Sequence, residues 1–155
     1  MKAARFSLVI LVMYVLGMMA VAIPAAAQGS PNPNIDLQCS PSSILIDVSP
    51  GSSRIGFTGC TATNPTNYAE DVQITVQSDG LGYAAPGSLT VPPLGTIDFD
   101  VTVRGDLQEA EGSHQLTVTA TVTAANGVAN PTPVPKTVAI IVVIEQFSRL
   151  QVEAE

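Results

Sequence analysis

Apolar and polar residues alternate one by one along several stretches of this 155-residue chain. Residues 96–104 are the clearest case, because positions 97, 99, 101 and 103 are apolar and the positions between them are polar or charged. Successive side chains of a β-strand point to opposite faces of a sheet, so this alternation predicts strands with one buried and one solvated face. Residues 72–77 and 116–123 repeat the pattern. Antiparallel sheets of this kind pack in pairs, and the chain is therefore predicted to form a two-layer sandwich.

Short strand signals separated by Gly, Pro, Asn and Asp follow one another from residue 35 onward, without an amphipathic helix pattern between them. The expected strands cover residues 35–39, 44–48, 54–63, 72–77, 88–91, 96–104, 113–124 and 137–144. We expect an all-β fold, an immunoglobulin-like antiparallel β-sandwich of about 7–8 strands. Its core is expected to be aliphatic, with a few aromatic residues and no tryptophan. Those aromatic residues are Phe57, Phe99, Phe147, Tyr68 and Tyr83.

The first 27 residues have the pattern of an export signal. Lys2 and Arg5 precede the apolar run 6–23, and Ala25–Ala27 supply the small residues that a signal peptidase requires. Cleavage would leave a linker over 28–34, a domain over 35–147 and a tail over 148–155 that could open a further repeat. The alternative is an uncleaved anchor, since about 18 apolar residues reach the lower limit of what spans a bilayer. The expected location is secreted or on the extracellular cell surface.

The charge of the chain argues against a nucleic-acid partner. The net charge is −7, and it becomes about −9 when Lys2 and Arg5 are removed with the signal. Such an acidic surface repels phosphate groups. No nucleic acid is therefore expected among the partners.

Cys39 and Cys60 are the two cysteines, and export into an oxidising compartment predicts that they form a disulfide. The turn signal at 49–52 supports this pairing. In a hairpin centred on this turn, any two residues that face each other have numbers that add to about 101. The two cysteine numbers add to 99. Two thiols and the single His114 provide too few ligands for a metal site.

The residues suited to chemistry are sparse. His114 is the only histidine, its position beside Glu111 suits a solvent-exposed side chain, and no catalytic triad can be assembled around it. We therefore predict neither an enzyme nor a bound cofactor. Acidic residues in outward or loop positions are weak candidates for calcium ligands, or else form a solvated face that keeps the domain soluble. These candidates are Asp98, Asp100, Glu70 and Asp71, with the last two expected in a loop.

The last expected strand, residues 137–144, departs from the alternation because it is apolar on both faces. One explanation is that the strand is central in its sheet and covered by loops. The other is that Ala139, Ile141 and Val143 form an interaction surface for a neighbouring repeat, subunit or other surface protein.

Several segments resemble a known group of proteins. Pro50-Gly51 leads into a strand, Cys60-Thr61-Ala62-Thr63-Asn64-Pro65-Thr66 and Tyr68-Ala69-Glu70 precede the next, and Ala110-Glu111-Gly112 precedes the long stretch 116–127. This pattern is similar to archaeal cell-surface proteins with immunoglobulin-like repeats, closest to the choice-of-anchor T group. The resemblance implies surface display and adhesion or scaffolding.

The expected function is accordingly a non-catalytic module with a structural, adhesive or protein-interaction role. The alternative is an extracellular receptor domain that binds a ligand or calcium. In the proteins that the chain resembles, a membrane anchor follows the repeats. Contact with a membrane is therefore expected only through an uncleaved signal or through an anchor beyond residue 155.

Overall fold

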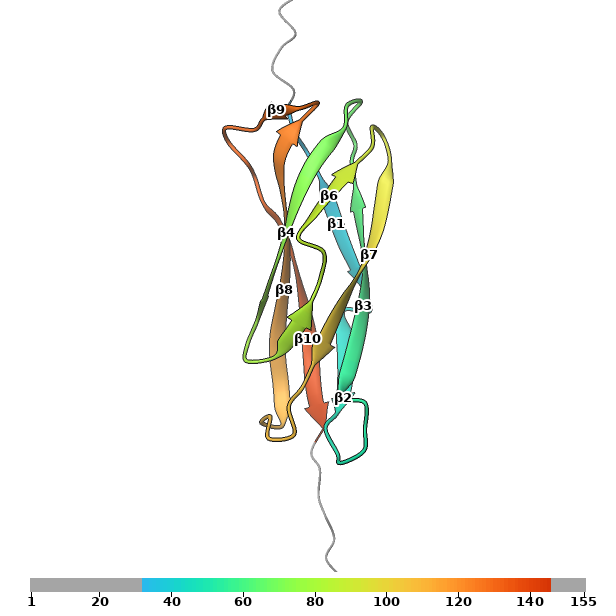
Figure 1. Cartoon of the computed structure of the whole chain (residues 1–155), viewed down its shortest axis with the longest axis vertical. Coiled ribbons are helices and arrows are strands. Elements are labelled where there is room, and N and C mark those ends of the chain that lie inside the picture. Colours follow the sequence, from blue (N-terminus) through green and yellow to red (C-terminus); the bar gives the residue numbers. More distant parts are fainter. Residues whose placement is uncertain (1–31, 146–155) are drawn as a thin grey trace, which may run out of the picture. The chain divides into compact units, whose positions relative to one another are not determined.

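The computed structural model describes residues 32–145, which contain ten β-strands and no helix (Figure 1). The strands are β1 (Asp36–Ser40), β2 (Ser43–Asp47), β3 (Ile55–Thr63), β4 (Glu70–Ser78), β5 (Gly82–Ala84), β6 (Ser88–Val91), β7 (Thr96–Arg104), β8 (Gly112–Ala125), β9 (Val128–Ala129) and β10 (Lys136–Glu145). Within the described range there is thus no helix that could cross a membrane. The predicted signal peptide, the first residues of the linker and the tail 148–155 lie outside the described residues.

The strands form two sheets packed face to face. One sheet has the order β1-β3-β7-β5, and the other has the order β2-β10-β8-β4-β6, with β9 paired to β8. Every pairing is antiparallel except that of β2 with β10. The predicted all-β sandwich is confirmed. All eight expected strands are present, and β5 and β9 add three and two residues that the sequence did not predict as strands.

The chain changes sheets between β1 and β2, at the cis peptide bond between Ser40 and Pro41. After this point β2 runs parallel to β10, and the N–H of Ile141 donates to the carbonyl of Ser42 at 3.0 Å. β2 also packs directly on β3, because a methyl group at Gly56 would overlap Ile44 and would lie 3.2 Å from Ile46. The sequence predicted these strands but not the sheet to which each belongs.

The close approach of β2 determines which residues of β3 can point inward. Gly56 and Thr58 are buried, and the Thr58 hydroxyl donates to the carbonyl of Pro41 at 2.9 Å. The larger Ile55 and Phe57 therefore point away from the core. The expectation that Phe57 belongs to the core is wrong, because 62% of its surface is exposed. Tyr83, also expected there, is half-exposed at the sheet edge.

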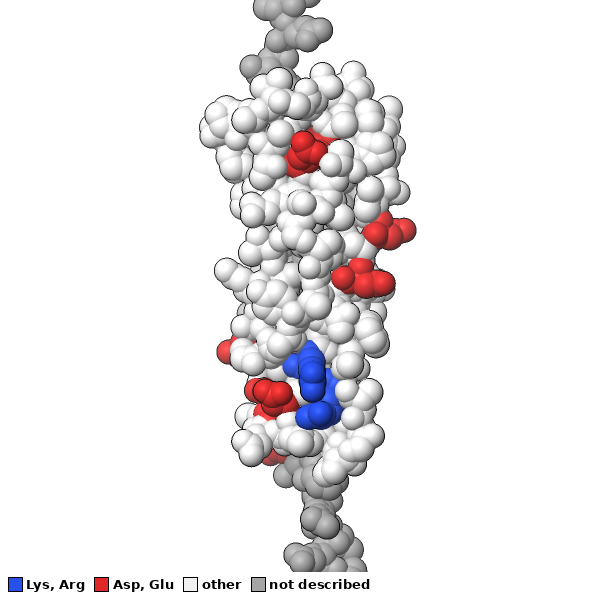
Figure 2. Space-filling view, viewed as in Figure 1, with Lys and Arg blue, Asp and Glu red and all other residues white. Residues whose placement is uncertain are grey.

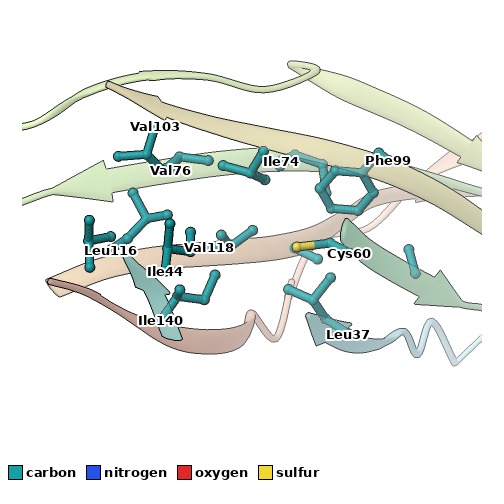
Figure 3. Close-up of a cluster of buried hydrophobic side chains, with 14 of the residues drawn as sticks. Leu37, Ile44, Cys60, Ile74, Val76, Phe99, Val103, Leu116, Val118 and Ile140 are labelled. Carbon is teal, nitrogen blue, oxygen red and sulfur yellow. The ribbon is translucent and has the colours of Figure 1, made fainter. Parts of the chain in front are cut away.

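The core lies between the two sheets and is mostly aliphatic, as predicted (Figure 3). Leu37, Cys60 and Phe99 come from the four-stranded sheet and belong to the same cluster of buried residues as Leu116 and Ile140 of the other sheet. Phe99 is the one aromatic side chain among the buried residues of the described range. The outer faces of both sheets remain exposed to solvent.

Candidate functional site

An exposed apolar surface lies on the outer face of β10 and β2, and we call it the β10 patch. It consists of Leu45, Ala139, Ile141 and Val143. Leu45 is 61% exposed and Ile141 is 51% exposed, while Ala139 is exposed and Val143 is half-buried. Val143 lies opposite Leu45 in the parallel β10–β2 pair. The three residues that the sequence singled out therefore share one outward face, and the structure adds Leu45 to them.

β10 has a strand on each side, as one of the two sequence-based explanations supposed, but Ala139 and Ile141 are not covered. The residues beside the patch are polar and uncharged: Ser43 and Gln115 flank Ile141, and Thr117 lies opposite Ala139. On this face, the charged residues of β2 and β10 lie at one end, where Asp47 is opposite Glu145 in the strand register. Lys136 begins β10 opposite the buried Ala120 and therefore belongs to the other side of the sheet. The patch is thus apolar with a neutral rim.

The two cysteines form the predicted disulfide, with an S–S distance of 2.05 Å. Cys39 lies directly opposite Cys60 in the β1–β3 pair, so the bond lies within one sheet. The simple hairpin behind the prediction is wrong, because β2 lies between the two cysteines in sequence and belongs to the other sheet. The bond has a structural position, since Cys60 is part of the core.

The four candidate calcium ligands are not brought together. Asp98 and Asp100 lie on the outer face of β7, where the Thr61 hydroxyl donates to Asp98 at 2.7 Å. Glu70 and Asp71 begin β4 in the opposite sheet. Within residues 32–145, no three acidic, histidine or cysteine side chains are placed to hold a metal ion.

Glu70 was expected in a solvated loop, and this prediction is wrong. It is the first residue of β4 and is fully buried. Its Oε1 atom accepts a hydrogen bond from the backbone N–H of Asn34 at 2.9 Å and one from the Thr66 hydroxyl at 3.3 Å. Oε2 has no hydrogen-bond partner among the described residues. Burial is the main cause that raises the pKa of this carboxyl, because a charge is less stable away from water.

Thr66 also links Glu70 to the buried Asn64. The Asn64 side chain donates to the carbonyls of Tyr68 at 2.8 Å and Pro92 at 3.1 Å. Its Oδ1 accepts a hydrogen bond from the N–H of Thr66 at 2.8 Å. This network joins the loops at one end of the sandwich, which is a structural role.

His114 is half-buried rather than fully exposed, and both of its ring nitrogens face carbonyl groups. Nε2 lies 2.9 Å from the carbonyl oxygen of Ala110, and Nδ1 lies 3.1 Å from that of Asp79. The Ala110 carbonyl is the main cause that raises the pKa of the imidazole, with further contributions from the Asp79 carbonyl and the charge of Glu109. The charged ring can donate both hydrogen bonds, and so His114 joins two loops.

Comparison with known proteins supports the fold. No family model matches the sequence, and no curated protein matches it. The FixG-related protein of Vibrio parahaemolyticus is similar in structure, with a TM-score of 0.51 and 7% identity over 75% of this chain and 99% of that one. The E. coli chaperone DraB also gives a TM-score of 0.51, with 13% identity over 71% of this chain. This chain has an immunoglobulin-like β-sandwich fold.

The likeness to these proteins extends to the sandwich alone, since both identities are low. The match spans 56% of the length of DraB. The resemblance to the choice-of-anchor T group stays a prediction.

Proposed function

We propose that this immunoglobulin-like domain is a non-catalytic module of a secreted or cell-surface protein that binds another protein through the β10 patch. The observation that carries the proposal is the exposure of Leu45 and Ile141 on adjacent strands of one sheet face. Contiguous exposed apolar surface is a feature of binding sites in soluble proteins, whereas isolated apolar residues are ordinary.

The chemistry of the patch favours a neutral, apolar protein surface as the partner. Its rim residues Ser43, Gln115 and Thr117 carry no charge, and Lys136 is the one cation on β10. Nucleic acids require clustered cations, and sugars are held mainly by stacking on aromatic rings, which the patch lacks. An apolar centre with an uncharged polar rim matches the usual composition of a protein interface.

A site-specific photocrosslinker in place of Leu45 tests this proposal in the full chain on its native cells. We expect a discrete protein adduct that is lost in the variant Ile141→Lys, because a charge would enter the contact without a partner. The matched control is Thr75→Lys, an exposed position of β4 on the same outer face, which should keep the adduct. Both variants should retain the wild-type melting temperature, because both side chains point outward. Absence of an adduct, or its survival in Ile141→Lys, would overturn the proposal.

The proposed compartment has its own test. Mass spectrometry of the exported protein should give Gln28 as the amino terminus, since the predicted cleavage site follows Ala27. An intact amino-terminal segment in the membrane fraction would instead identify an uncleaved anchor.

A further inference from the structure

The outer face of the four-stranded sheet carries a second apolar surface, distinct from the β10 patch. Ile55 and Phe57 point outward from β3 because the inner face of that strand is occupied by β2. Tyr83 lies on the edge strand β5 opposite the buried Val103, so this half-exposed ring borders the outer face and does not lie on it. A shallow hollow beside these residues is lined by Ile55, Gly82, Tyr83, Ala84, Thr102 and Arg104. Large apolar side chains and an arginine around a hollow are the composition that interface centres favour.

The charges on this face are separated along the strands. Arg104 lies at the end of β7, whereas Asp98 and Asp100 lie earlier on the outward side of the same strand. Figure 2 shows acidic side chains beside the upper part of β7 and basic side chains near its lower end. Among the outward residues of β3 and β7, the two aspartates therefore lie toward one end, and Arg104 and the apolar Ile55 lie at the other.

The strand register arranges these residues in rows across the sheet. Ile55 lies opposite Arg104, Phe57 opposite Thr102, and Gly59 opposite Asp100. The row of Phe57 and Thr102 is the middle one of the three. The row of Ile55 and Arg104 lies two residues to one side of it and is basic. The row of Gly59 and Asp100 lies two residues to the other side and is acidic.

This arrangement is complementary to itself. In a twofold dimer each surface patch meets the same patch of the other subunit, so residues equally far from the axis on opposite sides come together. An axis along the middle row places Arg104 against Asp100 of a second copy, and it makes this contact twice. Phe57 then meets Phe57 of the second copy. Ile55 faces Gly59, where a methyl group would have no neighbouring atom closer than 3.7 Å and a side chain has room to pack.

We propose that the outer face of the β1-β3-β7-β5 sheet is a homodimer surface, on which two copies pack antiparallel about the row of Phe57 and Thr102. Two sheets that meet face to face keep their strand directions within about 30° of each other, so the rows stay matched near the axis. The reciprocal charge pairs select a second copy over a uniformly acidic or basic partner, since either of these would face a like charge in one half of the surface.

Sedimentation velocity of the full chain over a concentration series tests the proposal through a charge exchange. We expect the wild type to dimerise, and Arg104→Asp or Asp100→Arg alone to raise the dimer dissociation constant about tenfold or more. The double variant should restore dimerisation, because Asp at 104 again meets Arg at 100 of the second copy. The matched control is Lys136→Asp, the same charge reversal at an exposed position of the other sheet, which should leave the dissociation constant unchanged.

Three outcomes would overturn the homodimer. A wild type that stays monomeric at the highest concentration excludes it. Failure of the double variant to regain the dimer, with melting temperatures unchanged, excludes the Arg104–Asp100 pairing. A dimer that is lost in Ile141→Lys and kept in Arg104→Asp assigns self-association to the β10 patch, which leaves the proposed function standing.

Discussion

The Glu70 carboxylate accepts a hydrogen bond from the backbone N–H of Asn34 at 2.9 Å, across 36 positions of sequence. The contact joins the segment before β1 to the first residue of β4, and Glu70 is fully buried there. A buried carboxylate whose second oxygen has no partner within residues 32–145 is costly when charged. The ionised form of Glu70 is therefore expected to lower the stability of the folded domain.

The variant Glu70→Gln should make this cost measurable. Burial raises the pKa of Glu70 above its ordinary value of 4.5, so the folded state holds the proton more tightly than the unfolded state. The protonated Glu70 side chain contributes its full stabilisation below the ordinary pKa. This stabilisation is lost as the pH rises through the pKa that Glu70 has in the folded state. We expect Glu70→Gln to melt at a higher temperature than the wild type near neutral pH, and the difference to shrink at about pH 4. A difference independent of pH would contradict this account. Glu70→Ala is the companion variant, and it should destabilise by about 1 kcal/mol because the Asn34 N–H loses its acceptor.

His114 should give a pH dependence in a higher range. The carbonyl of Ala110 is the main cause that raises the pKa of the imidazole above 6.5. The charged ring therefore stabilises the folded state below pH 6.5, and this stabilisation is lost as the pH rises through the pKa of His114 in the folded state. Thermal melts of His114→Ala should therefore show a larger deficit at about pH 5.5 than at about pH 8.5. His114→Gln retains one donor and should lie between the two proteins. Equal deficits at both pH values would show that the ring acts by packing alone.

Two glycines of β3 offer a matched pair of substitutions. A methyl group at Gly56 would overlap Ile44, so Gly56→Ala should destabilise by about 1–3 kcal/mol through overpacking. Gly59→Ala adds the same group to the outward side of the same strand, where the nearest atom is 3.7 Å away, and should be neutral or slightly stabilising. Denaturant unfolding of both variants measures the contrast. Similar losses at the two positions would mean that β2 does not pack on β3 as described.

Replacement of both Cys39 and Cys60 by alanine should lower the free energy of unfolding by about 3 kcal/mol, because the bond closes a loop with a sequence separation of 21. The wild type under reducing conditions should show a similar loss, and the double variant should not respond to the reductant. Free-thiol labelling of both cysteines in the folded, unreduced protein would refute the pairing.

Alternation predicted strands such as β4, β7 and β8 because each is long enough to show a period of two and to bury one face, whereas β10 is apolar on both faces. β5 and β9 have three and two residues, which is too short for any period to be visible. The parallel pairing of β2 with β10 could not be predicted, since Ile44 and Ile46 specify an inward face but no neighbouring strand.

The two outer surfaces differed in how far the sequence could reveal them. Ala139, Ile141 and Val143 could be identified from the sequence alone, because the β10 segment is apolar on both faces. Leu45 is a single outward residue of a short strand and gave no such signal. The outward direction of Phe57 depends on the contact between Gly56 and Ile44, which join strands of opposite sheets. A contact of that kind cannot be read from local periodicity.

The disulfide also determines how the domain transmits force. A pull on the chain before β1 and after β10 reaches Cys39, crosses the two sulfurs to Cys60, and continues along β3, so the segment between the cysteines carries no tension. That segment includes β2, which stays beside β10 as an unloaded strand. Reduction would release roughly 70 Å of chain. It would also load the parallel β2–β10 ladder in shear, because the two strands would be drawn from opposite ends. The redox state of one bond thus sets both the extensibility of the domain and the strands that resist stretching.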